Sequence, residues 1–399
     1  MDIHRYERRY EGAKRRLYRS PISERNKKLI ADFMDALMLE GISKPRILRY
    51  MENLRRFSSR LGKDLDEADL EDLRRVVAEI QQHSTWSPWT KQLHKIMIRR
   101  FYRWQAGTEE YPELVRWIKI GFSKSEKKLP SEGDLLTEDE VKKLLDVAEH
   151  PRDKAIIAVL WDSGTRIGEF GTLRLRNIAF DQHGAVITVH GKTGSRKVRL
   201  IWSVSYLSTW MQNHPLRKDS NSALWINIGW PNHHEPMEYK RFRNVLITLA
   251  RRAGITKRVN PHSFRHARAT FMASHLTEFQ MNQYFGWIQG SDMPGTYVHM
   301  SGKHCDDAIL AMNGLQPLPK KPEEQLRPQK CSKCETINSH EATYCIKCGG
   351  AMSVHGLMER QEDENAINRA MNELLKNEAM LKELAQKIVD QGLSKEQQR

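Results

Sequence analysis

Apolar side chains recur at every third or fourth position from residue 21 to residue 120, and this spacing constrains the fold more than any other feature. One run comprises Phe33, Leu37, Leu48, Met51, Leu54, Phe57, Leu70, Leu73 and Val77, and a second comprises Leu93, Ile96, Met97, Phe101, Tyr102 and Trp104. An α-helix turns once in about 3.6 residues, so this spacing gives each helix one apolar face. Residues 21–120 are therefore predicted to form an all-helical domain.

Two polar, proline-containing stretches are predicted to be linkers, at residues 121–134 (GFSKSEKKLPSEGD) and 316–330 (QPLPKKPEEQLRPQK). The first linker is preceded by a basic arm (residues 1–20) and the helical domain. A central domain (135–315) lies between the two linkers. The second linker is followed by a cysteine-containing segment (331–352) and a final helix (355–391). The apolar stripe of that helix suits a coiled coil, packing against the central domain, or docking on a second copy of the chain. The sequence does not decide among these three.

The central domain is predicted to be mainly helical with one small β-hairpin, an α+β fold. Thr137 and Glu140 form a capping box that opens a helix ending at Glu149, and a second helix covers residues 153–163. Residues 185–190 and 196–201 alternate as two strands around a turn at 191–194. Further helices are expected at about 204–213, 237–253, 263–275 and 278–286.

The charge of the chain indicates a polyanionic partner. Its 399 residues include 65 Lys and Arg against 50 Asp and Glu, a formal charge of +15. Residues 1–60 hold sixteen basic against eight acidic residues, which is about half of the excess. Basic side chains gain affinity for nucleic acid by releasing counterions from phosphates. No stretch approaches the roughly 20 apolar residues of a membrane span, so a cytoplasmic protein is expected.

Five short motifs follow one another in residues 160–300. They are Ser163–Glu169 (SGTRIGE) with Leu173-Arg174-Leu175, Lys192 in the hairpin turn, Pro261–His266 (PHSFRH), Gly286-Trp287 and Thr296–His299 (TYVH). In this order they resemble the tyrosine recombinase family, which includes phage integrases and Xer-type recombinases. The resemblance covers residues 135–310 strongly and 21–120 loosely, through the helical core-binding domain of that family. It implies breakage and rejoining of duplex DNA through a 3′-phosphotyrosyl bond.

The resemblance assigns Arg166 and Arg265 to the extra negative charge of the five-coordinate phosphorus, for which guanidinium groups are well suited. Lys192 would protonate the departing 5′-oxygen, although Lys197 and Lys303 are also basic. His262 would hydrogen-bond the phosphate or accept a proton, with a purely capping role as the alternative. His266 is expected to be structural, and Glu169 to orient Arg166 or a histidine.

Trp287 and Tyr297 complete the implied catalytic set. The family more often has histidine at the position of Trp287, and an indole donates a hydrogen bond but cannot accept a proton. Trp287 would therefore contact phosphate or pack in the core. Tyr297 would be the nucleophile, with Tyr284 as its rival in the neighbourhood. Because the phosphotyrosyl bond retains the energy of the broken bond, neither ATP nor a catalytic metal is required.

Cys331, Cys334, Cys345 and Cys348 form two Cys-x-x-Cys pairs separated by ten residues. This spacing is typical of a structural zinc ribbon with four thiolate ligands and no open coordination position. A redox pair is the weaker alternative, since a second pair would be redundant.

The implied assembly is a homo-tetramer on two DNA duplexes. The added segments favour an integrase of a mobile element, in archaeal style, over Xer-type resolution of DNA multimers. Two other functions compete with a site-specific recombinase. One is an architectural DNA-binding protein on the same fold, and the other is a relaxing topoisomerase with type IB-like chemistry.

Overall fold

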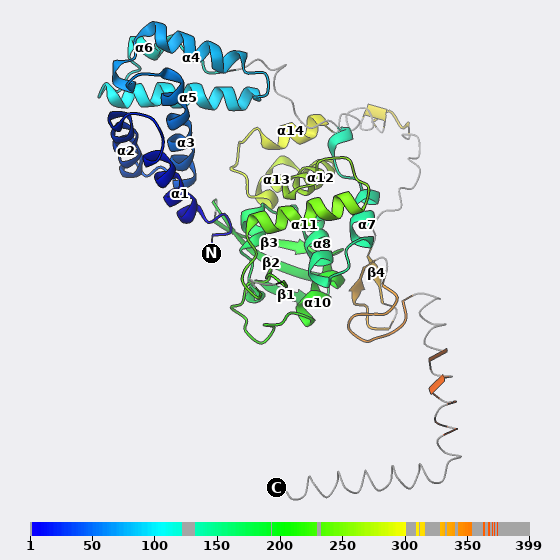
Figure 1. Ribbon diagram of the computed structural model, residues 1–399. Helices are drawn as coiled ribbons and strands as arrows, with labels where there is room; N and C mark the ends of the chain where they lie inside the picture. Colours follow the sequence, from blue (N-terminus) through cyan, green and yellow to red (C-terminus); the bar gives the residue numbers. More distant parts are fainter. Residues whose placement is uncertain are drawn as a thin grey trace, which may run out of the picture. The chain divides into compact units, whose positions relative to one another are not determined.

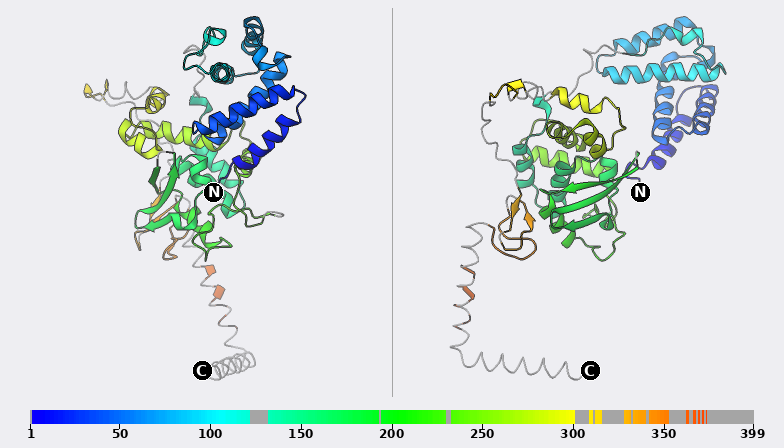
Figure 2. Two further views of the ribbon diagram at one scale, coloured as in Figure 1. Left: turned by 90° about the vertical axis from the view of Figure 1, so that its left-hand side faces the viewer. Right: turned by 180° about the vertical axis from the view of Figure 1, so that it is seen from behind.

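The computed structural model describes residues 2–121, 132–192, 194–229, 233–300, 309–310, 312–315, 328–331, 333–339, 342–352, 362–363, 366–367, 369, 371 and 373. It divides into two compact units, Met1–Gly133 and Asp134–Arg399 (Figures 1 and 2). Among these described residues, none of the helices combines the length and the apolar character needed to cross a membrane.

The first unit consists of helices: α1 (Tyr6–Tyr18), α2 (Glu24–Leu39), α3 (Lys44–Leu61), α4 (Leu70–Gln82), α5 (Pro88–Gln105) and the short α6 (Glu113–Arg116). Local signals set where they begin. The Ser23 side chain caps α2, Asp69 forms a capping box at α4, and Ser87 caps α5. These side chains accept hydrogen bonds from backbone N–H groups that have no partner within the helix.

One apolar core joins the helices of the first unit, with Phe33, Phe57 and Phe101 fully buried. Residues 1–20 differ from the expected separate arm, because they contain α1, which packs on α3. Its Tyr10 and Leu17 are buried in the same core. The prediction gave weight to the many arginines of this segment and missed its short apolar stripe. That stripe is sufficient for the helix to pack on α3.

The second unit contains α7 (Glu138–Asp146), α8 (Pro151–Ser163), α9 (Ile167–Gly171), α10 (Val204–Gln212), α11 (Tyr239–Arg252), α12 (Pro261–Ala273), α13 (Glu278–Phe285) and α14 (Met293–Met300). Between α9 and α10 lies an antiparallel sheet of β1 (Ile178–Asp181), β2 (Gly184–Gly191) and β3 (Gly194–Leu200). The buried helix α8 contacts α7, α10, α12 and β3, and so lies at the centre of the unit (Figure 1).

The predicted fold class, mainly helical with a small sheet, is confirmed. The hairpin is present with Gly191 opposite Gly194, and a third strand, β1, extends it. The capping box of Thr137 and Glu140 opens α7, which ends three residues before the predicted Glu149. The four later helices begin and end within two residues of their expected positions.

The cysteine-containing segment holds a two-stranded ladder, β4 (Gln329–Lys330) with β5 (Ile337–Asn338). Most of the predicted linkers, at residues 122–131 and 316–327, and most of the predicted final helix lie outside the described residues.

Gly164 has a positive φ of 56°, and a Cβ there would lie 3.0 Å from Arg268 and Phe285. Gly164→Ala is expected to lower the free energy of unfolding by about 1–2 kcal/mol, since an L side chain is strained in this region. Gly168→Ala is the control, because Gly168 lies in α9 and a Cβ added there would meet nothing within 4 Å. Urea unfolding followed by circular dichroism measures both, and equal midpoints would contradict the prediction.

Candidate active site

Arg166 is fixed by the turn between α8 and α9. Gly164 ends α8 in the left-handed conformation, and Arg166 two residues later is the N-cap of α9. Its Nη1 donates to Glu169 Oε1 at 3.0 Å, and its Nη2 donates to the carbonyl oxygen of Gly286 at 3.0 Å. The side chain is 36% exposed, so this guanidinium is held firmly and remains open to a ligand.

The carboxylate of Glu169 is only 3% exposed and also binds Arg196 of β3. Arg196 Nη1 and Nη2 donate to Oε1 and Oε2 at 2.9 and 2.7 Å, a bidentate pair. Burial by itself would raise the pKa of Glu169, but hydrogen bonds from Arg196 and Arg166 outweigh it and hold the pKa below its ordinary value. Glu169 is therefore ionised at neutral pH.

Arg265 lies beside Arg166 and is almost fully buried, with 6% of its surface exposed. Its Nη1 donates to the carbonyl oxygen of Gly164 and its Nη2 to that of Phe285, both at 3.0 Å. The guanidinium carbon lies 5.0 Å from the ring centre of Phe285 and 5.4 Å from that of Trp287. Burial and the nearby Arg166 charge lower the pKa of Arg265 to about 10, which leaves it protonated at neutral pH.

The two guanidinium groups share one anchor, the C-terminal end of α13. Arg265 binds the carbonyl of Phe285, and Arg166 binds the carbonyl of the next residue, Gly286. Carbonyls at a helix C-terminus carry partial negative charge and stabilise cations. Because the two acceptors are consecutive, the two positive groups are held next to each other despite their repulsion.

Tyr297 is 2% exposed and is stacked on Trp287, with ring centres 5.5 Å apart and planes at 8°. Its hydroxyl is hydrogen-bonded to His266 Nδ1 at 2.9 Å. Burial raises the pKa of Tyr297, and the charge of Arg265 opposes this. Burial, His262 and Arg265 lower the pKa of His266, so this imidazole is neutral at neutral pH.

The contact between His266 and the Tyr297 hydroxyl differs from the prediction, since the sequence predicts a structural role for His266. The available signal was its four-residue spacing from His262, which puts both imidazoles on one face of α12. His262 occupies the first turn of α12, where its backbone N–H donates to Asn260. Its side chain is exposed, yet partial burial and the charges of Arg265 and Arg166 lower its pKa.

Lys192 lies in the turn between β2 and β3 and is exposed. We call Arg166, Arg196 and Arg265, with the carboxylate of Glu169, the arginine cluster. The base of the β2–β3 turn contacts this cluster, because a Cβ on Gly191 would collide with Glu169 Oε1. The structure thus brings Arg166, Arg265, Trp287 and Tyr297 together, with His262 close enough that, besides burial, the charges of Arg265 and Arg166 lower its pKa. Lys192 is on the hairpin whose base packs against that cluster. Tyr284, the rival nucleophile, donates its hydroxyl to the carbonyl of Asp162.

The four predicted metal ligands also converge. The Sγ atoms of Cys331, Cys334, Cys345 and Cys348 all lie within 4.8 Å of one another. Sγ of Cys331 is 3.7 Å from that of Cys348, and Sγ of Cys334 is 3.5 Å from that of Cys345. All four cysteines are free thiols.

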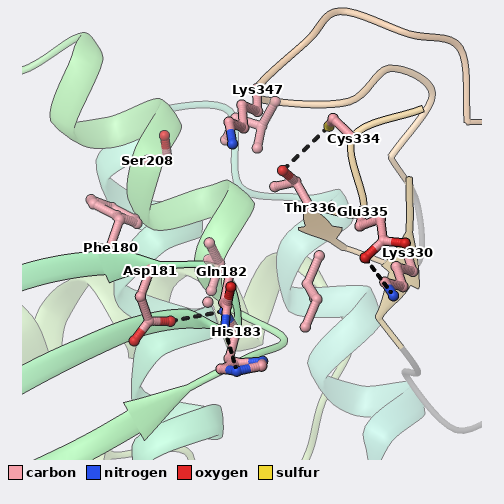
Figure 3. A pocket seen from close by; sticks show the side chains of 14 residues that line it. Phe180, Asp181, Gln182, His183, Ser208, Lys330, Cys334, Glu335, Thr336 and Lys347 are labelled. Carbon is pink, nitrogen blue, oxygen red and sulfur yellow. Dashed lines mark hydrogen bonds and ion pairs between the residues drawn. The ribbon is translucent and has the colours of Figure 1, made fainter. Parts of the chain in front are cut away.

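A cavity of about 760 Å³ lies between the β1–β2 turn and the cysteine-containing segment. Figure 3 shows Asp181 and His183 on one wall and Lys330, Glu335 and Lys347 on the other. The described residues that line it include no member of the arginine cluster and neither Tyr297 nor Lys192. The cavity is therefore separate from the candidate active site.

Residues 134–304 match the model of the Phage integrase family. The tyrosine recombinase XerA of Pyrococcus furiosus is 27% identical over 295 residues, which cover 73% of this chain and 96% of that protein. The tyrosine recombinase XerD of Caulobacter vibrioides is 27% identical over 284 residues, covering 66% and 88%. The matched family segment contains all six predicted catalytic residues.

Solved structures share the fold. The XerH site-specific recombinase in a post-cleavage complex with palindromic difH substrate aligns with a TM-score of 0.55 and 18% identity, covering 68% of this chain and 81% of that chain. A lambda integrase dimer bound to a COC′ core site aligns with a TM-score of 0.54 and 14% identity, covering 68% and 76%. At these identities the similarity establishes the fold alone.

Glu169→Gln is expected to lower the free energy of unfolding by about 3 kcal/mol at neutral pH, because it leaves two partly buried guanidinium groups without their carboxylate. The folded-state pKa of Glu169 lies below its ordinary 4.5. The stabilisation is therefore complete above pH 4.5 and is lost as the pH falls through the folded-state pKa. The difference between wild type and variant should shrink below pH 4.5.

Urea unfolding between about pH 3 and pH 7 measures this difference. Glu149→Gln is the matched control, since Glu149 is 89% exposed and pairs with Arg252 on the surface; it should change stability little at any pH. A difference between wild type and Glu169→Gln that stays constant with pH would contradict an ionised Glu169.

Proposed function

We propose that this chain, a tyrosine recombinase with a phage integrase domain at residues 134–304, cuts and rejoins duplex DNA at specific sites with the Tyr297 hydroxyl as nucleophile. One observation carries the proposal. Two guanidinium groups, those of Arg166 and Arg265, are anchored on consecutive carbonyls, and Arg265 lies close enough to the Tyr297 side chain for its charge to oppose the rise that burial causes in the pKa of the hydroxyl. Preorganised positive charge next to a hydroxyl is what attack on a phosphodiester requires.

In the proposed reaction the bond between the Tyr297 oxygen and phosphorus forms while the bond from phosphorus to the 5′-oxygen breaks. Arg166 and Arg265 stabilise the charge of the five-coordinate phosphorus. The neutral His266 contacts the phenolic hydroxyl and accepts its proton, and Lys192 donates a proton to the departing 5′-oxygen.

Two further side chains support this reaction. His262, at the N-terminal turn of α12, hydrogen-bonds the phosphate. Trp287 packs on both Tyr297 and Arg265 and so holds these two side chains in a fixed position relative to each other. Rejoining reverses these steps and consumes no ATP, because the phosphotyrosyl bond keeps the energy of the bond that was broken.

Double-stranded DNA is the proposed partner. The net charge of +15 suits it, and XerH and lambda integrase are both described in complex with DNA sites. A homo-tetramer on two duplexes follows from the need to cut four strands in pairs. The XerA and XerD relatives favour Xer-type resolution over integration of a mobile element.

The four cysteines are proposed to bind one structural zinc ion. Tetrahedral zinc with thiolate bonds of about 2.3 Å places its sulfur ligands about 3.8 Å apart. The distances of 3.7 and 3.5 Å between pairs of Sγ atoms fit this geometry. Four thiolates fill the coordination sphere, so the ion would stabilise the fold of the cysteine-containing segment and take no part in catalysis.

Tyr297→Phe is expected to abolish a covalent protein–DNA adduct that wild type forms on nicked duplexes prepared from the source genome. A nick lets the cut strand diffuse away and traps the phosphotyrosyl bond, which survives denaturing electrophoresis. Tyr284→Phe is the matched control and should keep the adduct, because that hydroxyl is bonded to a backbone carbonyl.

An adduct that persists in Tyr297→Phe would place the nucleophile elsewhere. Tight binding without any adduct would favour an architectural DNA-binding protein. Adducts on every supercoiled plasmid, with relaxation and no sequence preference, would favour a topoisomerase.

Cys331→Ser is expected to reduce the metal content from about one zinc per chain to a small fraction of that, since three thiolates hold zinc much less tightly than four. Elemental analysis of the purified protein by mass spectrometry measures this. Ser339→Ala is the control, because Ser339 lies in the same segment and outside the four-cysteine cluster. Equal zinc content in Cys331→Ser and wild type would refute the site.

A further inference from the structure

Arg196 and its partner Glu169 are buried charged residues of the site to which the proposed reaction gives no role. Arg196 lies on β3 with its side chain 11% exposed. Its guanidinium makes three hydrogen bonds, two to Glu169 and one from Nε to the carbonyl oxygen of Tyr284 at 2.8 Å. At 11% exposure these bonds are shielded from solvent, unlike those of an exposed surface ion pair.

We propose that Arg196 is a positioning residue that holds the β2–β3 turn, and with it Lys192, at the reacting phosphodiester. The inference rests on the proposed function of Lys192 as the proton donor to the 5′-oxygen. Arg196 would act by tying the hairpin to Glu169, the same carboxylate that orients Arg166. The positions of Lys192, the proton donor, and of Arg166, the charge-stabilising arginine, would then both depend on Glu169.

Both strands of the hairpin meet Glu169 close to the turn. From β2, the backbone of Gly191 lies so near that a Cβ there would collide with Glu169 Oε1. From β3, Arg196 binds both carboxylate oxygens. Lys192 follows Gly191 directly, and the ladder pairs Gly191 with Gly194 and Val189 with Arg196. Glu169 therefore contacts both strands of the hairpin within a few residues of Lys192.

The same guanidinium reaches the anchor of the two catalytic arginines. A Cβ on Gly286 would lie 2.7 Å from Arg196 Nη1, and the Gly286 carbonyl is the acceptor for Arg166. Arg196 therefore packs against the end of α13 as well as against Glu169. A displacement of the hairpin relative to α13 would have to break these bonds together.

The charge balance at Glu169 assigns different tasks to its two partners. Arg196 engages both carboxylate oxygens, whereas Arg166 has a single side-chain bond to Oε1 and is more exposed. One carboxylate between two guanidinium groups leaves a net positive charge. That charge is on the exposed side, at Arg166, so Arg196 can serve as a tether without weakening the attraction for phosphate.

A sulfur substitution at the leaving group tests this role. In single-turnover cleavage, wild type and variants receive a nicked duplex with either oxygen or sulfur at the 5′-bridging position of the scissile phosphate. With oxygen, the bond from phosphorus to the 5′-oxygen breaks and Lys192 supplies the proton. With sulfur, a thiolate leaves without a proton, because a thiol has a pKa of about 8.5. The sulfur substrate therefore bypasses Lys192 and anything that acts through it.

Arg196→Ala is expected to cleave the oxygen substrate about 100-fold more slowly than wild type, in the range of a lost general acid, and to regain most of the rate on the sulfur substrate. Lys192→Ala should behave in the same way. Arg196→Lys keeps the charge but loses the planar bidentate bond, and should be intermediate on the oxygen substrate. Arg199→Ala is the matched control on the same strand, with a surface ion pair to Asp181, and should match wild type on both substrates.

Each other result has a distinct meaning. An equal defect of Arg196→Ala and Arg196→Lys on both substrates would overturn the inference, since Arg196 would then act through Arg166 or through folding. Wild-type cleavage of the oxygen substrate by Arg196→Ala would overturn it as well. If Lys192→Ala is not rescued by sulfur, the failure lies in the proposed function of Lys192. If Tyr297→Phe still forms the adduct, the failure lies in the nucleophile.

Discussion

The buried carboxylate of Glu169 is the interaction on which the arrangement of the candidate active site depends. It is 3% exposed, and a lone carboxylate at that depth would take up a proton. Arg166 and Arg196 keep it ionised by approaching from two elements, the α8–α9 turn and strand β3. The carboxylate in return holds together two cations that would otherwise repel each other. The α8–α9 turn and the hairpin are thereby joined at the candidate active site.

The second constraint is the end of α13. Its last carbonyls accept from Arg265 and Arg166, and the ring of Phe285 lies under the Arg265 guanidinium. Trp287 follows immediately and stacks on Tyr297. A stretch of three residues, 285–287, thus contacts Arg166, Arg265 and the proposed nucleophile Tyr297. In the short sequence motif Gly286-Trp287, the glycine supplies the carbonyl that binds Arg166 and the tryptophan supplies the ring that stacks on Tyr297.

Local signals in the sequence were sufficient for the fold class and for most elements of the second unit, whereas the first unit was predicted only as helical at residues 21–120. The capping box of Thr137 marked where α7 begins, and strand alternation with a glycine turn marked the hairpin. Ser23 and Asp69 are caps of the same kind in the first unit, and only the structure showed them. The sequence motifs also indicated which residues to bring together. The supporting contacts were not predictable, because Arg196 meets Glu169 across 27 residues and Tyr284 across 88. No local pattern encodes such pairings. For the bond between His266 and Tyr297, 31 residues apart, the spacing of His262 and His266 indicates a shared helix face but not the partner.

The anchors of Arg166 and Arg265 are main-chain atoms, and this affects how the site can evolve. Substitution of a side chain cannot delete a carbonyl, so point mutation at residues 285 and 286 leaves the acceptors in place. What mutation can change is the path of the backbone, and here the tolerance is narrow, because Gly286 has a φ of 62° and Arg196 fills the space beside it. The site therefore tolerates a change of side-chain chemistry at its anchors, but it does not tolerate a change in the backbone conformation of the turn at Gly286.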